Sequence, residues 1–237
     1  MNSFQIIVPF YNDFKNFESF ISSLQSKNLP NDTFIIVDNG SNTNEITEFY
    51  NNSPEEKHFY KVVRSENNLG YGGGIVFGAK FINSEYIAWM PGNLKLDPFE
   101  VYNLFSSLDS FEDFSLIKAL RKNRPKIDTI KTLFFGIIAS LWFRTKMLDS
   151  GGVPCLVSKK LFENSDNFPI DFSFDVFILY YFKMKKLDIF RPKISYNKRK
   201  YGTSHWQKGL KSEIKLLFKI LSYKNQWDEK IIKIKEF

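Results

Sequence analysis

Hydrophobic positions in the first half of the chain form two alternating kinds of segment. Four short, continuous apolar runs predict strands covered on both faces. These runs are residues 4–8, 34–37, 59–64 and 86–90. Between and after them, apolar residues recur at the spacing of amphipathic helices. The predicted helices are residues 14–24, 42–50, 75–82 and 98–108. Strands that alternate with helices in this way predict an α/β fold with a mostly parallel sheet and right-handed crossovers.

Three further apolar segments follow, at residues 133–143, 172–182 and 210–221. Basic residues flank the first of them: Lys118, Arg121, Lys122, Arg124, Lys126, Lys131, Arg144 and Lys146. A bilayer span takes about 20 apolar residues, so this segment is too short to cross one. It is typical of a helix lying in the membrane interface, and equally of a core helix packed on the sheet. The second segment predicts a buried helix. The third, with interleaved lysines, predicts an amphipathic basic helix that lies on a membrane, acts as a lid or packs on the core.

The net charge of +7 conceals a division between the two halves of the chain. Residues 1–117 hold 7 Lys/Arg and 15 Asp/Glu, a net of −8, whereas residues 118–237 hold 26 and 11, a net of +15. This asymmetry suggests that the C-terminal half faces an anionic partner, either nucleic acid or a membrane surface. A solvated basic face is the simpler alternative.

Cysteine and histidine usage limits the chemistry. The single cysteine, Cys155, excludes an internal disulfide and favours a reducing compartment. With only two histidines besides, no His/Cys metal site can be assembled. We expect no signal peptide, because Met1 leads directly into a strand-like run.

Polar and glycine residues gather where the predicted strands end, at residues 9–13, 38–41 and 91–98. Ligands of open α/β sheets bind outside the carboxyl ends of the strands. There, Asp38 could accept hydrogen bonds from a ribose or base, or it could be a turn residue of D-N-G-S. The glycines of residues 70–74 predict a turn before the next helix, serving either a ligand or helix–sheet packing. They follow the third strand rather than the first, which disfavours a dinucleotide-dependent oxidoreductase.

Four motifs of the first half resemble the nucleotide-sugar half of family-2 glycosyltransferases with a GT-A fold. They are V-P-F-Y-N-D (8–13), I-V-D-N-G-S (36–41), N-L-G-Y-G-G-G (68–74) and the strand end at 91–98. Three later motifs are similar to the branch near the dolichyl- or polyprenyl-phosphate mannosyl- and glucosyltransferases. They are D-S-G-G-V-P-C-L-V-S-K-K-L-F (149–162), D-F-S-F-D (171–175) and R-K-Y-G-T-S-H-W (199–206).

The resemblance implies one GT-A domain with two functional halves. Residues 1–117 would bind the nucleotide sugar, residues 118–206 would bind the acceptor, and residues 207–237 would form a C-terminal helical tail. The donor would be a UDP- or GDP-sugar. The implied donor-site residues are Pro9, Tyr11 and Asp13 around the nucleotide, Asp38 at the uracil or guanine nucleoside, and Gly70, Gly72 and Gly73 near the sugar nucleotide.

The implied metal site is degenerate. Relatives carry an Asp-x-Asp motif at the end of the fourth strand, and it binds a divalent metal that bridges the diphosphate. The aligned residues here are 91–93, P-G-N, so that only Asn93 and the more distant Asp97 offer oxygen to Mg²⁺ or Mn²⁺, which prefer carboxylates. We therefore expect weak or absent metal dependence. The Lys95 ammonium would neutralise the diphosphate instead, unless it merely faces solvent.

Acidic residues of the second half are the candidate general bases. Inverting transfer to a hydroxyl requires a base, and a partly desolvated carboxylate can serve, whereas a phosphate acceptor needs none. The two candidates are Asp149, before a Gly-Gly pair, and Asp175, on the predicted buried helix. Asp171 is a third acidic candidate, for which a helix N-cap is the simpler alternative. By resemblance, Arg199 and Ser204 belong to a polar loop able to hold a phosphate.

The leading hypothesis is an inverting glycosyltransferase of cell-surface glycan synthesis, cytoplasmic and peripheral on the inner membrane face. It would move a sugar to a lipid-linked or saccharide acceptor. Two alternatives stay open: transfer to polyprenyl phosphate itself, and a non-catalytic nucleotide-sugar-binding or scaffold protein, which the lost Asp-x-Asp motif would fit. Charge alone would also fit a nucleic-acid binder, although we expect no nucleic-acid partner.

Overall fold

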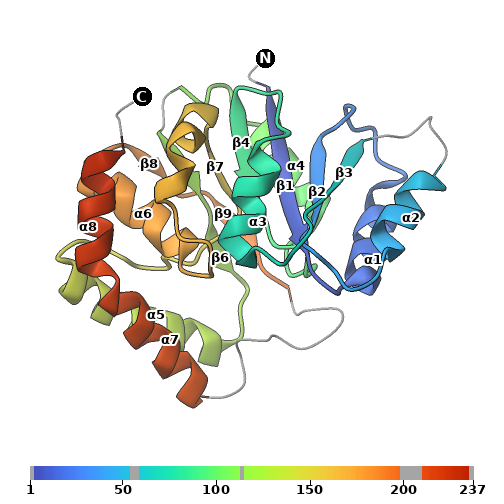
Figure 1. The fold of residues 1–237 in the computed structure, drawn as a ribbon. Coiled ribbons are helices and arrows are strands. Elements are labelled where there is room, and N and C mark those ends of the chain that lie inside the picture. Colours follow the sequence, from blue (N-terminus) through green and yellow to red (C-terminus); the bar gives the residue numbers. More distant parts are fainter. Residues whose placement is uncertain (1–2, 54–58, 113–114, 198–209, 235–237) are drawn as a thin grey trace.

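The computed structural model describes residues 3–53, 59–112, 115–197 and 210–234 of the chain (Figure 1). Arg199 and Ser204, two of the residues implied by the resemblance, lie outside the described residues.

A seven-stranded sheet with the order β3-β2-β1-β4-β7-β5-β8 forms the centre of the molecule. Its strands are β1 Phe4–Phe10, β2 Phe34–Asp38, β3 Tyr60–Arg64, β4 Tyr86–Trp89, β5 Leu116–Lys118, β7 Cys155–Ser158 and β8 Ile189–Phe190. Four of its pairings are parallel, whereas β7 runs antiparallel to both neighbours, β4 and β5. Strands β6 (Leu120–Lys122) and β9 (Lys193–Ser195) form a separate parallel pair. The mostly parallel sheet predicted from the sequence is confirmed.

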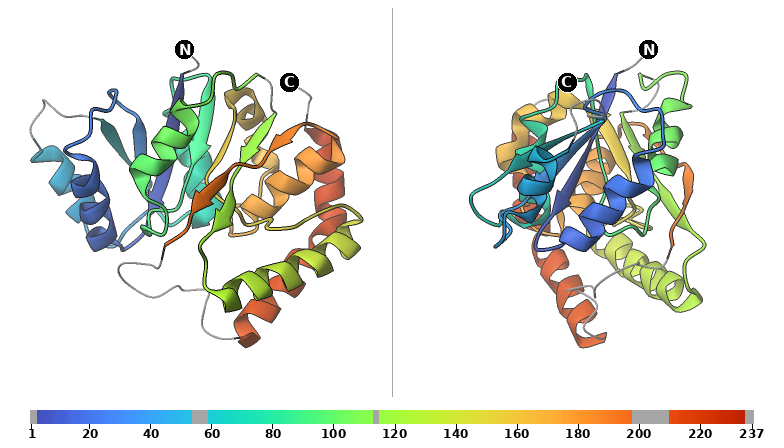
Figure 2. Two further views of the ribbon diagram at one scale, coloured as in Figure 1. Left: turned by 180° about the vertical axis from the view of Figure 1, so that it is seen from behind. Right: turned by 90° about the vertical axis from the view of Figure 1, so that its right-hand side faces the viewer.

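Helices cover both faces of the sheet. They are α1 Phe14–Leu24, α2 Glu45–Asn51, α3 Gly70–Ala79, α4 Pro98–Ser106, α5 Lys126–Phe143, the 3₁₀ helix η2 Lys159–Asn167, α6 Phe174–Met184, α7 Leu210–Ser222 and α8 Lys224–Lys233. Figures 1 and 2 show α1 and α4 on one face, and α3 and α6 on the other. This double cover explains why the strands are apolar throughout: Ile6, Ile7 and Val8 of β1 are fully buried. The predicted buried helix at 172–182 is also confirmed, since every residue of α6 from Phe174 to Phe182 is buried.

Strand β1 extends past the end that its proline predicts. We expect the strand to stop at Val8, yet it continues through Pro9 to Phe10. In a strand, the backbone N–H and C=O groups of successive residues point alternately toward the two neighbouring strands. The Ile7 carbonyl accepts a hydrogen bond from the N–H of Met90, just after β4, so the backbone groups of Ile7 point toward β4. The backbone nitrogen of Pro9, two residues later, therefore also points toward β4. The pairing of β1 with β4 has already ended there, at Ile7. The missing N–H of Pro9 removes no ladder hydrogen bond there.

The glycine cluster lies inside α3 rather than in a turn before it. The helix begins at Gly70, so the predicted start at residue 75 is wrong. An added Cβ at Gly72 would lie 2.3 Å from the carbonyl oxygen of Pro169, and one at Gly70 would lie 2.5 Å from that of Ile170. Gly73 N–H donates to the same Ile170 carbonyl, at 3.0 Å. Close approach of this backbone requires glycine at Gly72, and at Gly70 a positive φ of 76° adds a second requirement.

The two helices α5 and α7 lie past the edge at which β1 ends, as Figure 1 shows at the bottom of the molecule. They contact each other through an ion pair between Lys131 and Glu213, at 3.0 Å. Trp142 Nε1 also donates to the carbonyl of Leu221, at 2.9 Å. Among the described residues, no helix combines the length and the apolar content that a bilayer crossing requires.

Packing of α3 on the sheet depends on Gly78. An added Cβ there would lie 2.7 Å from Ile7 Cγ2 and 2.8 Å from Val37 Cγ2, on stiff β-branched side chains of β1 and β2. Overpacking costs about 1–3 kcal/mol, and alanine regains up to about 1 kcal/mol of helix propensity. We expect Gly78→Ala to lower the free energy of unfolding in urea by about 1–2 kcal/mol.

Gly151→Ala is the matched control, because its Cβ would meet only Arg121 Nη2, at 3.9 Å. It should change the unfolding free energy by less than about 0.5 kcal/mol. Equal effects of the two substitutions would contradict tight helix–sheet packing at Gly78.

Candidate active site

The carboxyl ends of β1, β2, β4 and β5 meet at one edge of the sheet. Because β7 runs antiparallel, the loop that precedes it, residues 149–154, joins them at the same edge. The structure thereby brings together predicted site residues from both halves of the chain. Asp38 and Asn93 come from the first half, and Asp149 comes from the second.

Between the loops that follow β1 and β2 lies a cavity of about 290 Å³. Its lining residues are Asn12, Asp13, Phe14, Ser41, Asn42, Thr43, Glu45 and Ile46. The two loops hold each other in place: Asn12 N–H donates to Ser41 Oγ at 2.9 Å, and Asn42 N–H donates to Asn12 Oδ1 at 2.8 Å. The cavity lies where an open α/β sheet binds its ligand.

Asp38 is fully buried behind this cavity. Its carboxylate accepts from Arg64 Nη1 at 2.9 Å and from Ser41 N–H at 3.1 Å. Arg64 also donates to the carbonyls of Ser41 and Thr43. The ion pair therefore shapes the loop that lines the cavity. Sequence reasoning missed Arg64, although an arginine at the end of the adjacent strand was a readable signal. The direct contact of Asp38 with a nucleoside stays a prediction.

The other predicted nucleotide residues lie on or beside the β1 loop. Asp13 lines the cavity, and its carboxylate accepts from Asn16 Nδ2 at 2.8 and 2.9 Å. Tyr11 is 39% exposed, which leaves its ring accessible to a ligand. Pro9 is half-buried, and its ring lies 3.3 Å from the position of an added Cβ on Gly74.

The end of β4 does not fit a divalent metal. Asn93 Oδ1 accepts from Lys95 N–H at 3.2 Å, and Asp97 Oδ1 caps α4 by accepting from the N–H groups of Phe99 and Glu100. Within the described ranges, no group of three or more His, Cys, Asp or Glu side chains could hold a metal ion. The carboxylate set that Mg²⁺ and Mn²⁺ prefer is therefore not assembled by these residues.

Asp175, at the start of α6, lies in a buried polar cluster next to the end of β4. Trp89 Nε1 donates to its Oδ1 at 2.8 Å, and the Tyr71 hydroxyl also hydrogen-bonds to the carboxylate. Lys118 Nζ lies 4.0 Å away. Burial raises the pKa of Asp175, and the opposing effects of Lys118, Trp89 and Tyr71 do not cancel it. A carboxylate with a raised pKa is a suitable proton acceptor.

Lys118 is not part of the basic surface to which the sequence pattern assigns it. It is fully buried, and its ammonium donates to the Gly152 carbonyl at 2.7 Å and to Cys155 Sγ at 3.3 Å. Its position in a buried strand, L-I-K, was the signal for this role. Burial raises the pKa of the Cys155 thiol to about 12, so that Cys155 is a packing residue rather than a thiolate nucleophile.

Asp149 has the opposite environment from Asp175. Its carboxylate accepts from Arg121 Nε at 3.0 Å, from Arg121 Nη2 and from the Arg121 backbone N–H at 3.2 Å. Arg191 donates to the Asp149 carbonyl at 3.2 Å. Burial acts to raise the pKa of Asp149, but Arg121 and, more weakly, Arg124 outweigh it and lower that pKa. Asp149 is thus a structural anion and a weak proton acceptor.

Asp171 is not the N-cap of α6, as the alternative reading of its position expected, because Ser173 holds that place and Asp171 lies two residues before it. Its Oδ1 accepts from the N–H and the hydroxyl of Ser173, at 2.9 and 2.6 Å. Its Oδ2 pairs with Lys219 of α7 at 2.8 Å. This ion pair joins the C-terminal helices to the region of Asp175.

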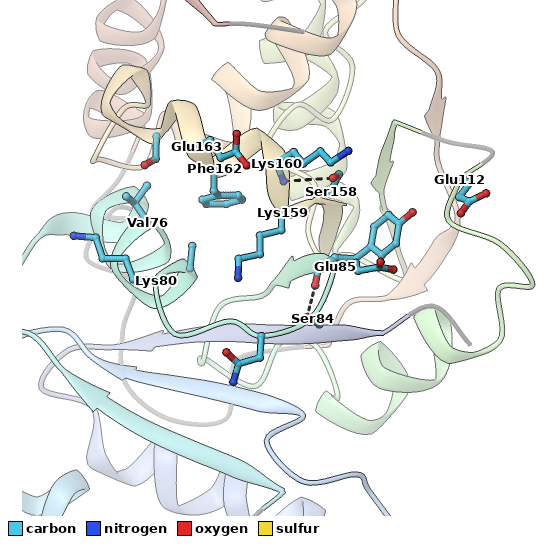
Figure 3. Close-up of a pocket in the computed structure, with 14 residues that line it drawn as sticks. Val76, Lys80, Ser84, Glu85, Glu112, Ser158, Lys159, Lys160, Phe162 and Glu163 are labelled. Atoms are coloured by element: carbon cyan, nitrogen blue, oxygen red, sulfur yellow. Dashed lines mark hydrogen bonds between the residues drawn. The ribbon is translucent and has the colours of Figure 1, made fainter. Parts of the chain in front are cut away.

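A larger hollow, of about 630 Å³, lies at the opposite edge, where β4 begins and β7 ends (Figure 3). Val76 of α3 and Lys80, directly after that helix, lie on one side of it, and Phe162 and Glu163 of η2 lie on another (Figure 3). None of the site residues predicted from the sequence lines this hollow. Size alone therefore does not identify the functional site, and the carboxyl edge remains the candidate.

The family model for glycosyl transferase family 2 matches residues 5–163. Among solved structures, glucosyl-3-phosphoglycerate synthase from Mycobacterium tuberculosis in complex with Mn²⁺, UDP and glucosyl-3-phosphoglycerate is similar at a TM-score of 0.65. The two sequences are 13% identical, and the match covers 99% of this chain and 81% of that one. The same synthase with Mn²⁺, UDP-glucose and glycerol 3-phosphate gives a TM-score of 0.64 at 14% identity, with 99% and 82% covered. No curated protein matches the chain. The predicted GT-A fold is confirmed.

Removing the Asp149 carboxylate should destabilise the protein. Asp149→Asn keeps a residue that tolerates the left-handed backbone of this position (φ 46°) but leaves the Arg121 guanidinium without its anion. Breaking a buried ion pair in this way costs about 3–5 kcal/mol. We expect Asp149→Asn to lower the free energy of unfolding at pH 7, measured by chemical denaturation, by an amount near the lower end of that range.

The difference in unfolding free energy between wild type and Asp149→Asn should become smaller as the pH falls. The folded-state pKa of Asp149 is lowered, so its contribution is complete above the unfolded-state pKa and disappears as pH falls through the folded-state value. Wild type and Asp149→Asn should therefore converge in strong acid. Asp166→Asn, which removes an exposed carboxylate of η2, is the control and should change stability by less than about 0.5 kcal/mol. A pH-independent difference would contradict the ion-pair explanation.

Proposed function

Because the chain belongs to glycosyl transferase family 2, we propose that it transfers a sugar from a nucleoside-diphosphate sugar to a lipid-linked acceptor at a membrane surface. The observation that supports a lipid-linked acceptor is the exposed apolar face of α5, which lies beside the carboxyl edge of the sheet. The proposed place of action is the cytoplasmic face of the membrane, in cell-surface glycan synthesis.

A UDP-sugar is the donor that the structural neighbours favour, since they were solved with UDP and UDP-glucose. The nucleoside would occupy the cavity between the β1 and β2 loops, with Asp13 on its wall and the Asp38–Arg64 pair behind it. A GDP-sugar remains the second choice. Both share the diphosphate, which must extend along the carboxyl edge toward β4.

After Lys126 at its start, the exposed side of α5 is mostly apolar, with Thr129 as an exposed polar residue. Seven large apolar residues, each between 46% and 76% exposed, recur at helical spacing: Ile127, Ile130, Leu133, Phe134, Ile137, Leu141 and Trp142. The opposite side of the helix contributes Gly136, Ala139 and Phe143 to the interior. Ile214 and Phe218 of α7 extend the exposed apolar area. We call these nine exposed residues the α5–α7 surface. A surface of this kind marks an interaction site.

Basic side chains around the α5–α7 surface favour a membrane as its partner. Exposed cations stand at both ends of α5 and along α7: Lys126, Arg144, Lys146, Lys211, Lys215 and Lys219. An apolar helix face bordered by Lys and Arg binds in the interface of an anionic bilayer. Lys219 also pairs with Asp171, four residues before Asp175. A lipid acceptor held in the bilayer would therefore present its head group close to the candidate base.

The proposed chemistry is an in-line displacement at the anomeric carbon. The acceptor oxygen attacks that carbon, the bond from carbon to the β-phosphate oxygen breaks, and the electron pair leaves with the nucleoside diphosphate. For a hydroxyl acceptor, the proton passes to the Asp175 carboxylate, and the product has inverted configuration. For a polyprenyl phosphate acceptor, no proton transfer is needed. Asp149 then serves to hold Arg121 rather than to accept a proton.

Turnover tests this proposal directly. UDP- and GDP-sugars are supplied with acceptors extracted from membranes, and transfer to lipid is followed by radiolabel. Transfer to an organic-extractable product supports the proposal. Binding of the donor without any transfer would identify a nucleotide-sugar-binding protein instead, and transfer only to water-soluble saccharides would remove the lipid acceptor.

Asp175→Asn should lower kcat with a hydroxyl acceptor by about 10²–10⁴-fold, the contribution typical of a general base. Since burial raises the pKa of Asp175, the acid limb of the kcat/KM profile should lie above the ordinary aspartate value of about 3.9, and activity should fall as pH drops through it. The limb should vanish in the variant, whereas Asp166→Asn should keep the wild-type profile. Unchanged kcat in Asp175→Asn would remove Asp175 as the base.

Vesicle binding should depend on the α5–α7 surface. We expect the protein to cosediment with vesicles that contain phosphatidylglycerol, less so as salt rises, and weakly with pure phosphatidylcholine. Phe134→Asp with Leu141→Asp should weaken binding at least about tenfold, because each change removes a large apolar side chain from the interface. Ile232→Asp, at an 80% exposed position on α8, is the control. Equal binding of all three proteins would contradict the membrane role.

A further inference from the structure

Three cationic side chains surround one aromatic ring at the carboxyl edge. Lys95 Nζ lies 5.6 Å from the centre of the Tyr196 ring, and the guanidinium carbons of Arg121 and Arg124 lie 5.4 and 5.7 Å from it. We call Lys95, Arg121 and Arg124 the cation cluster. Its members come from the loop after β4, from β6 and from the residues before α5.

Backbone hydrogen bonds build the cluster from both sides. Tyr196 N–H, directly after β9, donates to the Lys122 carbonyl of β6 at 3.0 Å. The next residue, Asn197, donates to the Lys95 carbonyl at 2.7 Å. The ring is thus fixed between the β4 loop and the β6–β9 pair, and the cations converge on a rigid centre. Such contacts between cations and a ring are favourable and keep the charges close together.

Two acids act on the arginines of the cation cluster. Asp149 pairs with Arg121 and also acts on Arg124, and Asp128 of α5 acts on Arg124 more weakly. Arg124 Nη1 itself donates to a neutral group, Thr132 Oγ1, at 2.8 Å. Burial and then the charge of Arg121 lower the pKa of Arg124, a sign that the cations repel each other. An anionic ligand would relieve this repulsion.

The place of the cluster matches the path of a donor diphosphate. The nucleoside cavity lies at the ends of β1 and β2, and β4 is the other neighbour of β1. The turn after β4 touches β1 directly, since a Cβ added to Gly92 would lie 2.4 Å from the Phe10 ring. Adjacent strands are about 4.8 Å apart, so a diphosphate that leaves the cavity toward β4 passes the end of that strand, from which the loop with Lys95 starts.

We infer that the cation cluster binds the diphosphate of the donor directly and takes the place of a divalent metal. Arg124, whose Nη1 bonds to a neutral hydroxyl, donates charged hydrogen bonds to phosphate, and the lysine adds a point charge. Arg121, whose Nε and Nη2 are engaged by Asp149, adds its charge. As the bond to the sugar breaks, the same groups stabilise the charge on the leaving diphosphate. The nature of the donor rests on the proposed function, whereas the binding of a diphosphate without metal does not.

Calorimetry with inorganic pyrophosphate, UDP and GDP, and with uridine and guanosine, tests the inference. Each ligand is titrated in EDTA and again with Mn²⁺. We expect pyrophosphate and at least one nucleotide to bind in EDTA with an affinity within about threefold of that in Mn²⁺, and the nucleotide to bind more tightly than its nucleoside. The affinity should fall with rising salt.

The variant Lys95→Ala with Arg124→Ala should weaken nucleotide and pyrophosphate binding about tenfold to hundredfold for each cation that is removed, because each one donates charged hydrogen bonds to the phosphates. Binding of the nucleoside should not change. Arg121 is left intact, because its removal would leave Asp149 unpaired. Lys122→Ala with Lys193→Ala, which removes two exposed charges from the same β6–β9 pair, is the control and should bind like wild type. Thermal unfolding verifies that both variants fold.

Each outcome separates this inference from the proposed function. Diphosphate binding that requires Mn²⁺, or that survives in Lys95→Ala with Arg124→Ala, overturns the inference and leaves glycosyl transfer standing if sugar is turned over. Binding in EDTA that is lost in the variant, without turnover of any nucleotide sugar, supports the inference and overturns the proposed function. No binding of pyrophosphate or nucleotide under either condition overturns both.

Discussion

Between β4 and β5, the central sheet contains one strand, β7, that runs against both neighbours. This reversal places the start of β7, rather than its end, at the edge where the parallel strands finish. The loop of residues 149–154 therefore meets the ends of β1, β2, β4 and β5. Through this reversal, Asp149 of the second half comes to the same edge as the cavity between the β1 and β2 loops. A parallel β7 would carry that loop to the far side of the sheet.

Burial at this edge separates the functions of two chemically identical side chains. Asp149 is enclosed by the Arg121 guanidinium and stays anionic, whereas Asp175 is enclosed by Trp89, Tyr71 and a more distant ammonium. The pKa of the first is lowered and that of the second is raised. Pairs of carboxylates with such opposed environments are typical of sites that need one fixed charge and one proton acceptor.

The positive charge of the C-terminal half is divided between three environments. Lys118 is fully buried beside Asp175, the cation cluster surrounds Tyr196, and the exposed lysines border the α5–α7 surface. Lys118 faces a side chain of the protein, whereas we propose a diphosphate for the cation cluster and a lipid head group for the α5–α7 surface. The net charge of +15 over residues 118–237 is therefore not one basic face.

Much of the fold could be predicted from local pattern. The runs at 4–8, 34–37, 59–64 and 86–90 are strands because continuous apolar stretches of this length must be covered on both faces. The motifs at their ends were sufficient to indicate the family. The helix start at Gly70 was missed because its glycines are needed for close contact with residues 169–174, which lie about a hundred positions away in the sequence. In the same way, the partners of Asp38, Asp149 and Asp175 come from other strands and loops. The sequence by itself determined which segments are strands and helices, since hydrophobic period is a local property. Only the tertiary structure decided which charges are buried together and which face of α5 stays in contact with solvent, because burial and charge pairing depend on distances between segments remote along the chain.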